Sequence, residues 1–377
     1  MIRIPFNRPF ATGDELEYVR AAIAAPKFSG DGPFTAECHR LLQQSLGVQK
    51  ALLTTSCTHA LEMAALLLNI EPEDEVIVPA FTFPSAINAF VLRGGRPVFV
   101  DVRADTLNID EAQIEQRITE HTKAIFLVHY AGVGCELNTI MPIARRHRIA
   151  VVEDNAHGLY GKYRGQYLGT FGDLATLSFH ETKNFSCGEG GALLINDAQL
   201  NERAEILREK GTDRSRFFRG EVDKYTWVDI GSSYLPSDIL AAFLRAQFEH
   251  RDQIQSRRHQ IWDAYSQELA AWAEANGVRL HAVPPECEQT YHMFYVIMPS
   301  LESRQALITH LAGCGILGVF HYLPLHLSPM GVRFGGRQGD CPVTEDLSDR
   351  LLRLPFFTGM SSSEQSQVIA AVSAFRC

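Results

Sequence analysis

Two residues with reactive side chains follow apolar, strand-like runs of the sequence. Lys183 comes shortly after the run 174–179 (LATLSF) and just before the glycine-rich stretch 188–191 (GEGG). A lysine in such a place can form a Schiff base, because burial near other cations lowers the pKa of its amine and makes it nucleophilic. Asp154 ends the run 150–154 (AVVED), and acidic residues at this end of a strand lie where α/β proteins bind ligands. Most lysines are solvated surface charges, so Lys183 alone does not define a site.

His157 and the junction at residues 54–58 (TTSCT) each have two interpretations. A strand that runs into a helix through small hydroxyl residues leaves free N–H groups and a positive dipole end, which suit a phosphate. Plain N-capping by Ser56 or Thr58 explains the same residues. His157 lies three residues past Asp154, so either the two face one site or they are a surface histidine and a loop-capping aspartate.

The order of these features along the chain matches the needs of one cofactor. Pyridoxal 5′-phosphate requires anchors for its phosphate, an acid for its pyridine nitrogen and an amine for its aldehyde. The helix start at 54–58, Asp154 and Lys183 supply these groups in that order. An aromatic residue is also expected to stack on the ring, and Phe83, just past the strand-like run 75–79 (EVIVP), is well placed for this role.

Motifs for other cofactors are incomplete. Gly132 and Gly134 follow a strand-like run, but the G-x-G-x-x-G pattern of nicotinamide-binding folds is not completed. His180 and Glu181 do not begin an H-E-x-x-H motif, because no histidine closes it. No other group of His and Cys has the spacing of metal ligands, so no metal is predicted.

Between about residues 50 and 200, short β-rich runs alternate with helical stretches. Near-continuous apolar strands that alternate with helices indicate the α/β class, with a mostly parallel central sheet covered on both faces. We expect strands at 51–55, 75–79, 97–102, 124–129, 150–154, 174–179 and 191–196. We expect helices at 58–68, 84–92 and 139–147.

The pattern changes near residue 237. Residues 237–269 predict one long helix, which Ser237 or Asp238 could cap. Further on, the sequence predicts strands at 293–298 and 318–323, a helix at 304–313 and a terminal helix. We therefore expect an N-terminal arm (1–29), a large cofactor-binding α/β domain (30–245) and a smaller α+β domain (246–377). The polar stretch 211–220 (GTDRSRFFRG) is a candidate mobile loop.

Composition excludes several classes of function. The 377 residues include 35 Lys and Arg against 44 Asp and Glu, a net charge of −9, which argues against a general nucleic-acid or anionic-membrane binder. No apolar run reaches the roughly 18 residues of a membrane span, and residues 1–6 do not resemble a signal peptide. The eight cysteines form no C-x-x-C pair, which predicts free thiols and a cytoplasmic protein.

Together these motifs resemble the DegT/DnrJ/StrS group of sugar-nucleotide aminotransferases. The resemblance covers nearly the whole chain and rests on Asp154, His157 and the stretches 79–83 (PAFTF), 178–184 (SFHETKN), 188–191 (GEGG) and 321–326 (HYLPLH). Within the group, the stretches 28–32 (FSGDG), 180–184 (HETKN) and 229–234 (DIGSSY) are most similar to enzymes that aminate C4 of dTDP-4-oxo-6-deoxy-D-glucose.

The resemblance implies a fold, an assembly and residue roles. It implies a pyridoxal 5′-phosphate-dependent transferase of fold type I, and a homodimer with the active site at the subunit interface. Lys183 would form the Schiff base with the cofactor, Asp154 would pair with the pyridine nitrogen, and His157 would lie near the ring hydroxyl. The phosphate would be held by Ser178, Cys57 and Thr58, and the ring would stack on Phe83. The sugar-nucleotide entrance would be lined by His321, Tyr322 and His326.

One stretch departs from the pattern of many relatives. They have G-Y-N-Y-R-M, whose Asn reaches across the dimer to the phosphate, where this chain has 231–236 (GSSYLP). Ser233 stands in place of that Asn and is shorter. Three outcomes stay open: the Ser233 hydroxyl contacts the phosphate directly, contacts it through water, or makes no contact. The Ser-Ser form favours the subgroup that aminates C4.

The implied reaction is transamination of dTDP-4-oxo-6-deoxy-D-glucose at C4, with L-glutamate as amino donor and 2-oxoglutarate as its product. The product would be a dTDP-4-amino-4,6-dideoxyhexose for surface polysaccharide, of which the galacto isomer (enterobacterial common antigen) is favoured over the gluco isomer (O-antigen). Amination at C3 of a related dTDP-sugar is an alternative. Family members that dehydrate sugars have His in place of Lys183, so its presence favours transamination. The pair Asp154 and Lys183 argues against a non-catalytic regulatory member.

Overall fold

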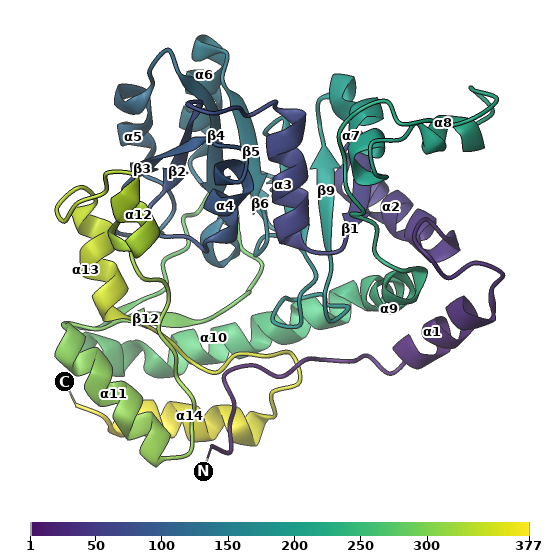
Figure 1. Ribbon diagram of the computed structural model, residues 1–377. Coiled ribbons are helices and arrows are strands. Elements are labelled where there is room, and N and C mark those ends of the chain that lie inside the picture. The colour runs from purple at the N-terminus through teal and green to yellow at the C-terminus, as the bar shows by residue number, and fades with distance from the viewer. Residues whose placement is uncertain (1, 377) are drawn as a thin grey trace.

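The computed structural model describes residues 2–376 and is built around a seven-stranded sheet (Figure 1). The strands lie in the order β1 (Lys50–Thr54), β9 (Gly191–Ile195), β8 (Leu174–Ser178), β5 (Ala150–Asp154), β4 (Thr122–Val128), β2 (Glu75–Pro79) and β3 (Arg96–Val100). From β8 to β3 all neighbours run parallel, whereas β9 is antiparallel to both β8 and β1. The prediction of a mostly parallel α/β sheet is therefore confirmed.

Helices cover both faces of this sheet because successive strand residues point to opposite sides. On one face, Val152 packs with the helices α3 (Cys57–Leu67), α4 (Ser85–Val91) and α7 (Asn201–Arg208). On the other face, Val151 packs with α6 (Leu137–His147). That second face is extended by α2 (Pro33–Leu46) and α9 (Asp238–Glu249). Covering both faces is why the strands read as continuous apolar runs.

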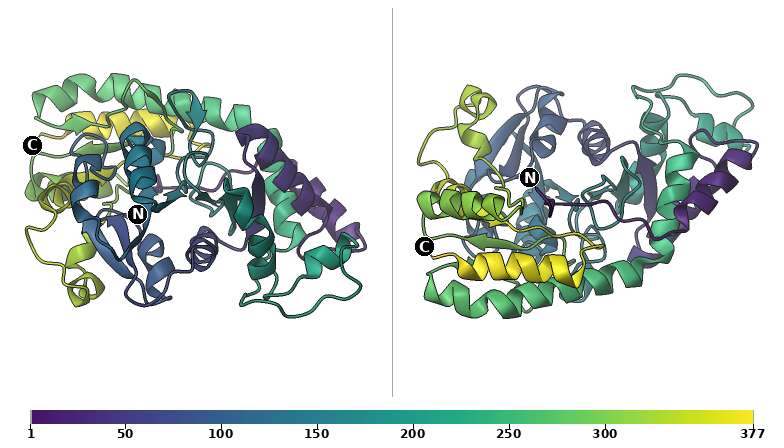
Figure 2. Two further views of the ribbon diagram at one scale, coloured as in Figure 1. Left: turned by 90° about the horizontal axis from the view of Figure 1, so that it is seen from above. Right: turned by 90° about the horizontal axis from the view of Figure 1, so that it is seen from below.

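The C-terminal part has its own core. A three-stranded antiparallel sheet, β10 (Arg279–Leu280), β12 (Tyr295–Ile297) and β13 (Leu351–Arg353), packs with helices α10 (Arg251–Ala275), α11 (Leu301–Gly313) and α14 (Ser362–Ala374). Figure 2 shows α14, in yellow, alongside α10. Ile4 belongs to the same core, so the N-terminal segment returns to this part of the chain. The division at residues 29 and 245 stays a prediction.

The remaining elements are short or peripheral. They are the helices α1 (Glu15–Ala24), α5 (Glu111–Ile114), α8 (Arg214–Phe218), α12 (Pro329–Arg333) and α13 (Pro342–Arg350), and the small sheet of β11 (Cys287–Glu288), β6 (Lys162–Tyr163) and β7 (Gln166–Tyr167). Within residues 2–376, no helix is both long and apolar enough to cross a membrane. The seven cysteines in this range are all unpaired.

Three sequence predictions differ from the structure. The long helix predicted at 237–269 is two helices that meet at His250, whose φ of −96° and ψ of 18° end the first helix. The predicted cap is confirmed, because the Ser237 side chain accepts a hydrogen bond from the Leu240 N–H at the start of α9. Residues 318–323 form no strand beyond a bridge between Val319 and Arg353, and the chain soon reaches Pro324, which has no N–H to donate. The polar stretch 211–220 contains the short helix α8.

Asp238, the first residue of α9, joins this helix to α2. Its carboxylate is fully buried and accepts hydrogen bonds from the N–H groups of Phe34 (3.2 Å) and Thr35 (2.7 Å) and from the Thr35 hydroxyl (2.7 Å). These are first-turn donors of α2, which have no acceptor within their own helix. A side chain of α9 thus caps α2.

We predict that Asp238→Asn lowers the free energy of unfolding by about 1–3 kcal/mol, because the amide places a donor against the α2 N–H groups. Chemical denaturation measures this loss. The matched control is Asp252→Asn on α10, whose side chain is 93% exposed and which should change stability by less than about 0.5 kcal/mol. Equal stability of both variants and the parent would contradict the capping role.

Candidate active site

A cavity of about 350 Å³ lies at the carboxyl ends of β5 and β8 and at the start of α3. Most residues predicted from the sequence line it: Cys57, Thr58, Phe83, Asp154, His157, Ser178, Lys183, His321 and Tyr322. The parallel sheet explains this convergence, because its strand ends meet at one edge. The structure tests the positions of these residues, and their roles stay predictions.

The Lys183 side chain is half-buried and lines the cavity, and its amine has no acceptor among the described residues. Lys183 follows β8 in a turn in which its N–H donates to the His180 carbonyl (2.9 Å). Among residues 2–376 no side chain or carbonyl accepts a hydrogen bond from its amine. Burial lowers the pKa of this amine, and the positive charge of Arg353 adds to the effect, while Cys57 and Asp154 oppose it. The environment therefore makes this amine easier to deprotonate than a lysine in water.

The Asp154 carboxylate is buried and is not paired with a cation in residues 2–376. One oxygen accepts from the Ala156 N–H (3.1 Å). Burial raises the pKa of Asp154, and this hydrogen bond and the charge of Lys183 act in the other direction. A buried carboxylate that has no cationic partner in the described chain is suited to a protonated ring nitrogen, which would stabilise its charged form.

The start of α3 offers free donors to an anion. Ser56 caps the helix by accepting from the His59 N–H (3.1 Å), so the capping interpretation holds. The N–H groups of Cys57 and Thr58 nonetheless have no acceptor in the part of the chain that the structure describes, as expected for a first turn. Gly191 approaches closely, since a Cβ there would lie 2.4 Å from the Cys57 nitrogen. Capping and anion binding are therefore compatible at this helix start.

His157 presents a neutral ring to the cavity. Its Nδ1 accepts from the Ala131 N–H (3.3 Å), so its Nε2 carries the hydrogen. Burial holds the pKa of His157 well below the usual range, and the charge of Lys183 lowers it further. The Nε2–H group is therefore a hydrogen-bond donor, which the predicted contact to the ring hydroxyl of pyridoxal 5′-phosphate requires.

His292, which sequence reasoning missed, stacks on His157 with ring centroids 4.3 Å apart. Its Nδ1 donates to the Asn184 Oδ1 (2.9 Å), because the Asn184 amide nitrogen already donates to the Thr290 carbonyl (2.7 Å). Asn184, the neighbour of Lys183, is thus hydrogen-bonded to His292, whose ring stacks on His157. The only sequence signal was a histidine just before the apolar run at 293–298.

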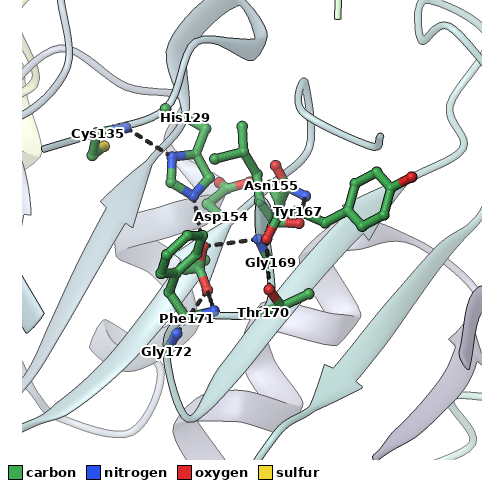
Figure 3. A network of polar contacts seen from close by, with 12 residues as sticks. His129, Cys135, Asp154, Asn155, Tyr167, Gly169, Thr170, Phe171 and Gly172 are labelled. Carbon is green, nitrogen blue, oxygen red and sulfur yellow. Dashed lines mark hydrogen bonds and ion pairs between the residues drawn. The ribbon is translucent and has the colours of Figure 1, made fainter. Parts of the chain in front are cut away.

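A buried carboxylate anchors the strand end that carries Asp154. Glu153 accepts hydrogen bonds from the N–H groups of Gly169 (2.8 Å), Phe171 (2.8 Å) and Gly172 (2.7 Å) and lies 2.8 Å from His129 Nε2. The His129 Nδ1 accepts from a backbone N–H (3.2 Å), so Nε2 carries a hydrogen and donates to Glu153. Figure 3 shows this network, in which His129 and the loop glycines surround the end of β5.

Two predicted residues lie outside the cavity. The turn after Pro324 directs His326 away from the cavity that His321 and Tyr322 line. The His326 side chain is fully buried, and its Nε2 forms a hydrogen bond with Glu345 (2.9 Å). Ser233 lines a second cavity of about 810 Å³. Its predicted contact across a dimer is not tested by one chain. Within residues 2–376, no group of three or more His, Cys, Asp or Glu is arranged to hold a metal.

A lysine amine without a partner, an unpaired acid at a neighbouring strand end and a free helix start are the parts that a pyridoxal 5′-phosphate enzyme of fold type I needs. Residues 10–373 match the model of the DegT/DnrJ/EryC1/StrS aminotransferase family, and the chain belongs to this family. It is therefore a sugar aminotransferase whose cofactor is pyridoxal 5′-phosphate.

Individual relatives agree with this assignment. The chain is 33% identical over 373 residues to GDP-perosamine synthase of Escherichia coli O157:H7, covering 99% of this chain and 98% of that protein. It is 29% identical to the spore coat polysaccharide biosynthesis protein SpsC of Bacillus subtilis (strain 168), covering 98% and 96%. Its fold is similar to the putative sugar aminotransferase Spr1654 from Streptococcus pneumoniae in its PMP-form, with a TM-score of 0.92, 28% identity and 98% of each chain covered.

We predict that Glu153→Gln lowers the free energy of unfolding by about 2–4 kcal/mol, because an amide cannot accept all four hydrogen bonds and turns a donor toward buried N–H groups. Thermal and chemical denaturation measure the loss. The control is Glu288→Gln, whose side chain is 63% exposed and pairs only with Lys162. A Glu153→Gln protein as stable as this control would show that the network does not hold the strand end.

Proposed function

We propose that this enzyme transfers the amino group of L-glutamate to C4 of dTDP-4-oxo-6-deoxy-D-glucose, giving a dTDP-4-amino-4,6-dideoxyhexose of the galacto configuration and 2-oxoglutarate. One observation carries the proposal: the Lys183 amine, which has no acceptor in residues 2–376, lines the cavity that Asp154 and the start of α3 also line. A lowered pKa makes such an amine a better nucleophile and proton acceptor than an ordinary lysine.

The cofactor supplies an electrophilic carbon and a ring that accepts electrons when it is bound. Lys183 would take the proton from the donor Cα at its Nζ and would deliver it to the cofactor carbon that carries the amino nitrogen, and the lowered pKa of this amine favours the first transfer. Asp154 would keep the ring nitrogen protonated. The Cys57 and Thr58 N–H groups would hold the phosphate, and the His157 Nε2–H would orient the ring hydroxyl.

The nucleotide is the part of the substrate for which a second candidate has support. The relative of Escherichia coli O157:H7 at 33% identity is named GDP-perosamine synthase, and so is a relative of Caulobacter vibrioides at 32% identity. These names favour a GDP-linked 4-oxo sugar as the alternative substrate. With a chain charge of −9, either nucleotide must be held by local cations and helix starts.

We also propose a homodimer with the active site at the subunit interface. The segment that precedes Ser233 exposes large apolar side chains, with Phe218 67% and Trp227 75% exposed. Ser233 itself lies in the second cavity, which Lys27, Lys210 and Arg214 also line. If a partner subunit covered this apolar segment, the three cations and the Ser233 hydroxyl of the first subunit would lie close to the partner's active site and its anionic ligands.

The test is an assay with L-glutamate and three sugars: dTDP-4-oxo-6-deoxy-D-glucose, its UDP analogue and a GDP-linked 4-oxo-6-deoxyhexose. We expect kcat/KM to be at least about tenfold higher for the dTDP-sugar, which corresponds to roughly 1.4 kcal/mol of transition-state binding. NMR of the product should show an axial amino group at C4.

Lys183→Ala is the control, and it should bind the cofactor but release no 2-oxoglutarate. Preference for the GDP-sugar would replace the nucleotide assignment and leave the reaction class intact. An equatorial amine would replace the galacto assignment. Normal turnover by Lys183→Ala would overturn the mechanism.

A further inference from the structure

A strained turn lies beside the cavity, in the segment between β11 and β12. Tyr291 has a φ of 53°, a backbone conformation that residues other than glycine keep only where the surrounding structure holds it. Its neighbours Thr290 and His292 are both buried, and His292 lines the cavity together with Lys183. Strained backbone of this kind is concentrated at functional sites, where it directs the neighbouring side chains.

A buried arginine of α10 holds this turn. Arg258 donates from Nε to the Tyr291 carbonyl (2.9 Å) and from Nη2 to the His292 carbonyl (2.5 Å). It is 2% exposed, and within residues 2–376 no carboxylate forms an ion pair with it. Burial lowers the pKa of Arg258 to about 9. Because a buried cation is costly unless its donors are satisfied, these carbonyls are strongly held, and the turn is held with them.

The turn contacts both sides of the candidate site. The Thr290 hydroxyl donates to the His157 carbonyl (2.6 Å), and the Thr290 carbonyl accepts from the Asn184 amide nitrogen (2.7 Å). The His292 ring stacks on the His157 ring, with centroids 4.3 Å apart and planes 18° apart. Its Nδ1 donates to the Asn184 Oδ1 (2.9 Å). One segment thus connects His157 with the neighbour of Lys183.

The orientation of the His157 ring depends on this stacking. The other restraint on the ring is the hydrogen bond from the Ala131 N–H to Nδ1, which at 3.3 Å is long and therefore weak. A ring turned by half a rotation would present a lone pair where the Nε2–H donor lies. The His292 ring is itself anchored through Asn184, so it is a rigid surface against which His157 packs.

No charge separates the two stacked rings. Burial keeps the pKa of both imidazoles well below the usual range, and the charges of Lys183 and Arg353 lower both further. The charge of Arg258 acts on His292 in the same direction. Because both rings are neutral, they can pack face to face without repulsion.

We propose that His292 is a positioning residue: by stacking on His157 and bonding to Asn184, it holds the His157 Nε2–H group ready for the ring hydroxyl of pyridoxal 5′-phosphate. The proposal rests on the proposed role of His157 and does not depend on which sugar is the substrate. A donor at the ring oxygen reduces the negative charge there. The nitrogen that joins the cofactor to Lys183 then releases its proton more easily.

The test is a pH titration of the visible absorbance of the holoenzyme, which changes as the nitrogen joined to Lys183 loses its proton. We expect His292→Ala to raise the pH midpoint by about one pH unit, because the His157 donor is no longer held at the ring oxygen. His157→Leu removes the donor itself and should raise the midpoint at least as much.

The matched control is His281→Ala. His281 is also a buried histidine of the C-terminal part, and its ring stacks on Tyr295 with centroids 4.4 Å apart. It does not line the cavity. This variant should lose stability in thermal denaturation, as His292→Ala should, but its midpoint should stay that of the parent.

The outcomes separate the two proposals. If His157→Leu moves the midpoint and His292→Ala does not, His292 has a structural role alone and the inference is overturned, while the role of His157 stands. If neither variant moves it, both fall. If His292→Ala does not fold, His292→Asn replaces it, because asparagine keeps an amide donor for Asn184 but no ring against His157. An unchanged midpoint in His292→Asn has the same force.

Discussion

The desolvation of one amine is the constraint on which the rest of the site depends. Lys183 has no acceptor for its amine in residues 2–376, and partial removal from water lowers the pKa of this amine. A lysine in this state is costly to the fold, so the surrounding elements must hold it rigidly. They do so from three directions: β8 and the following turn carry it, β5 presents Asp154, and α3 presents its first N–H groups. The C-terminal part closes the cavity with His292, His321 and Arg353.

The supporting contacts are as specific as the groups they support. Glu153 fixes the end of β5 through three backbone N–H groups and His129. Within residues 2–376, its neighbour Asp154 accepts only one hydrogen bond through its side chain. Two adjacent carboxylates on one strand thus have different tasks, because strand residues alternate between opposite faces. Glu153 is satisfied by the protein, and Asp154 faces the cavity without a cationic partner in residues 2–376.

Sequence patterns predicted most of the sheet because buried parallel strands are continuous apolar runs between helices, and β5 begins and ends where expected. They also predicted the helix start at Ser56 and the position of Lys183 after a strand, because each follows an apolar run in the local sequence. They missed His292 and Arg353, since these enter the cavity only through the packing of the C-terminal sheet. Arg353 had a faint signal, as the one cation in the run 351–354 (LLRL). His326 shares its motif with His321, but a turn separates them, and periodicity carries no information about turns.

The central claim is that Lys183 is the residue that joins the cofactor. Borohydride reduction of the holoenzyme, followed by proteolysis and mass spectrometry, tests this claim directly because reduction makes the linkage permanent. The account predicts a phosphopyridoxyl group on the peptide that contains Lys183, and no labelled peptide from a Lys183→Ala protein treated in the same way. Label on another lysine, or none on a protein that has bound the cofactor, would contradict it.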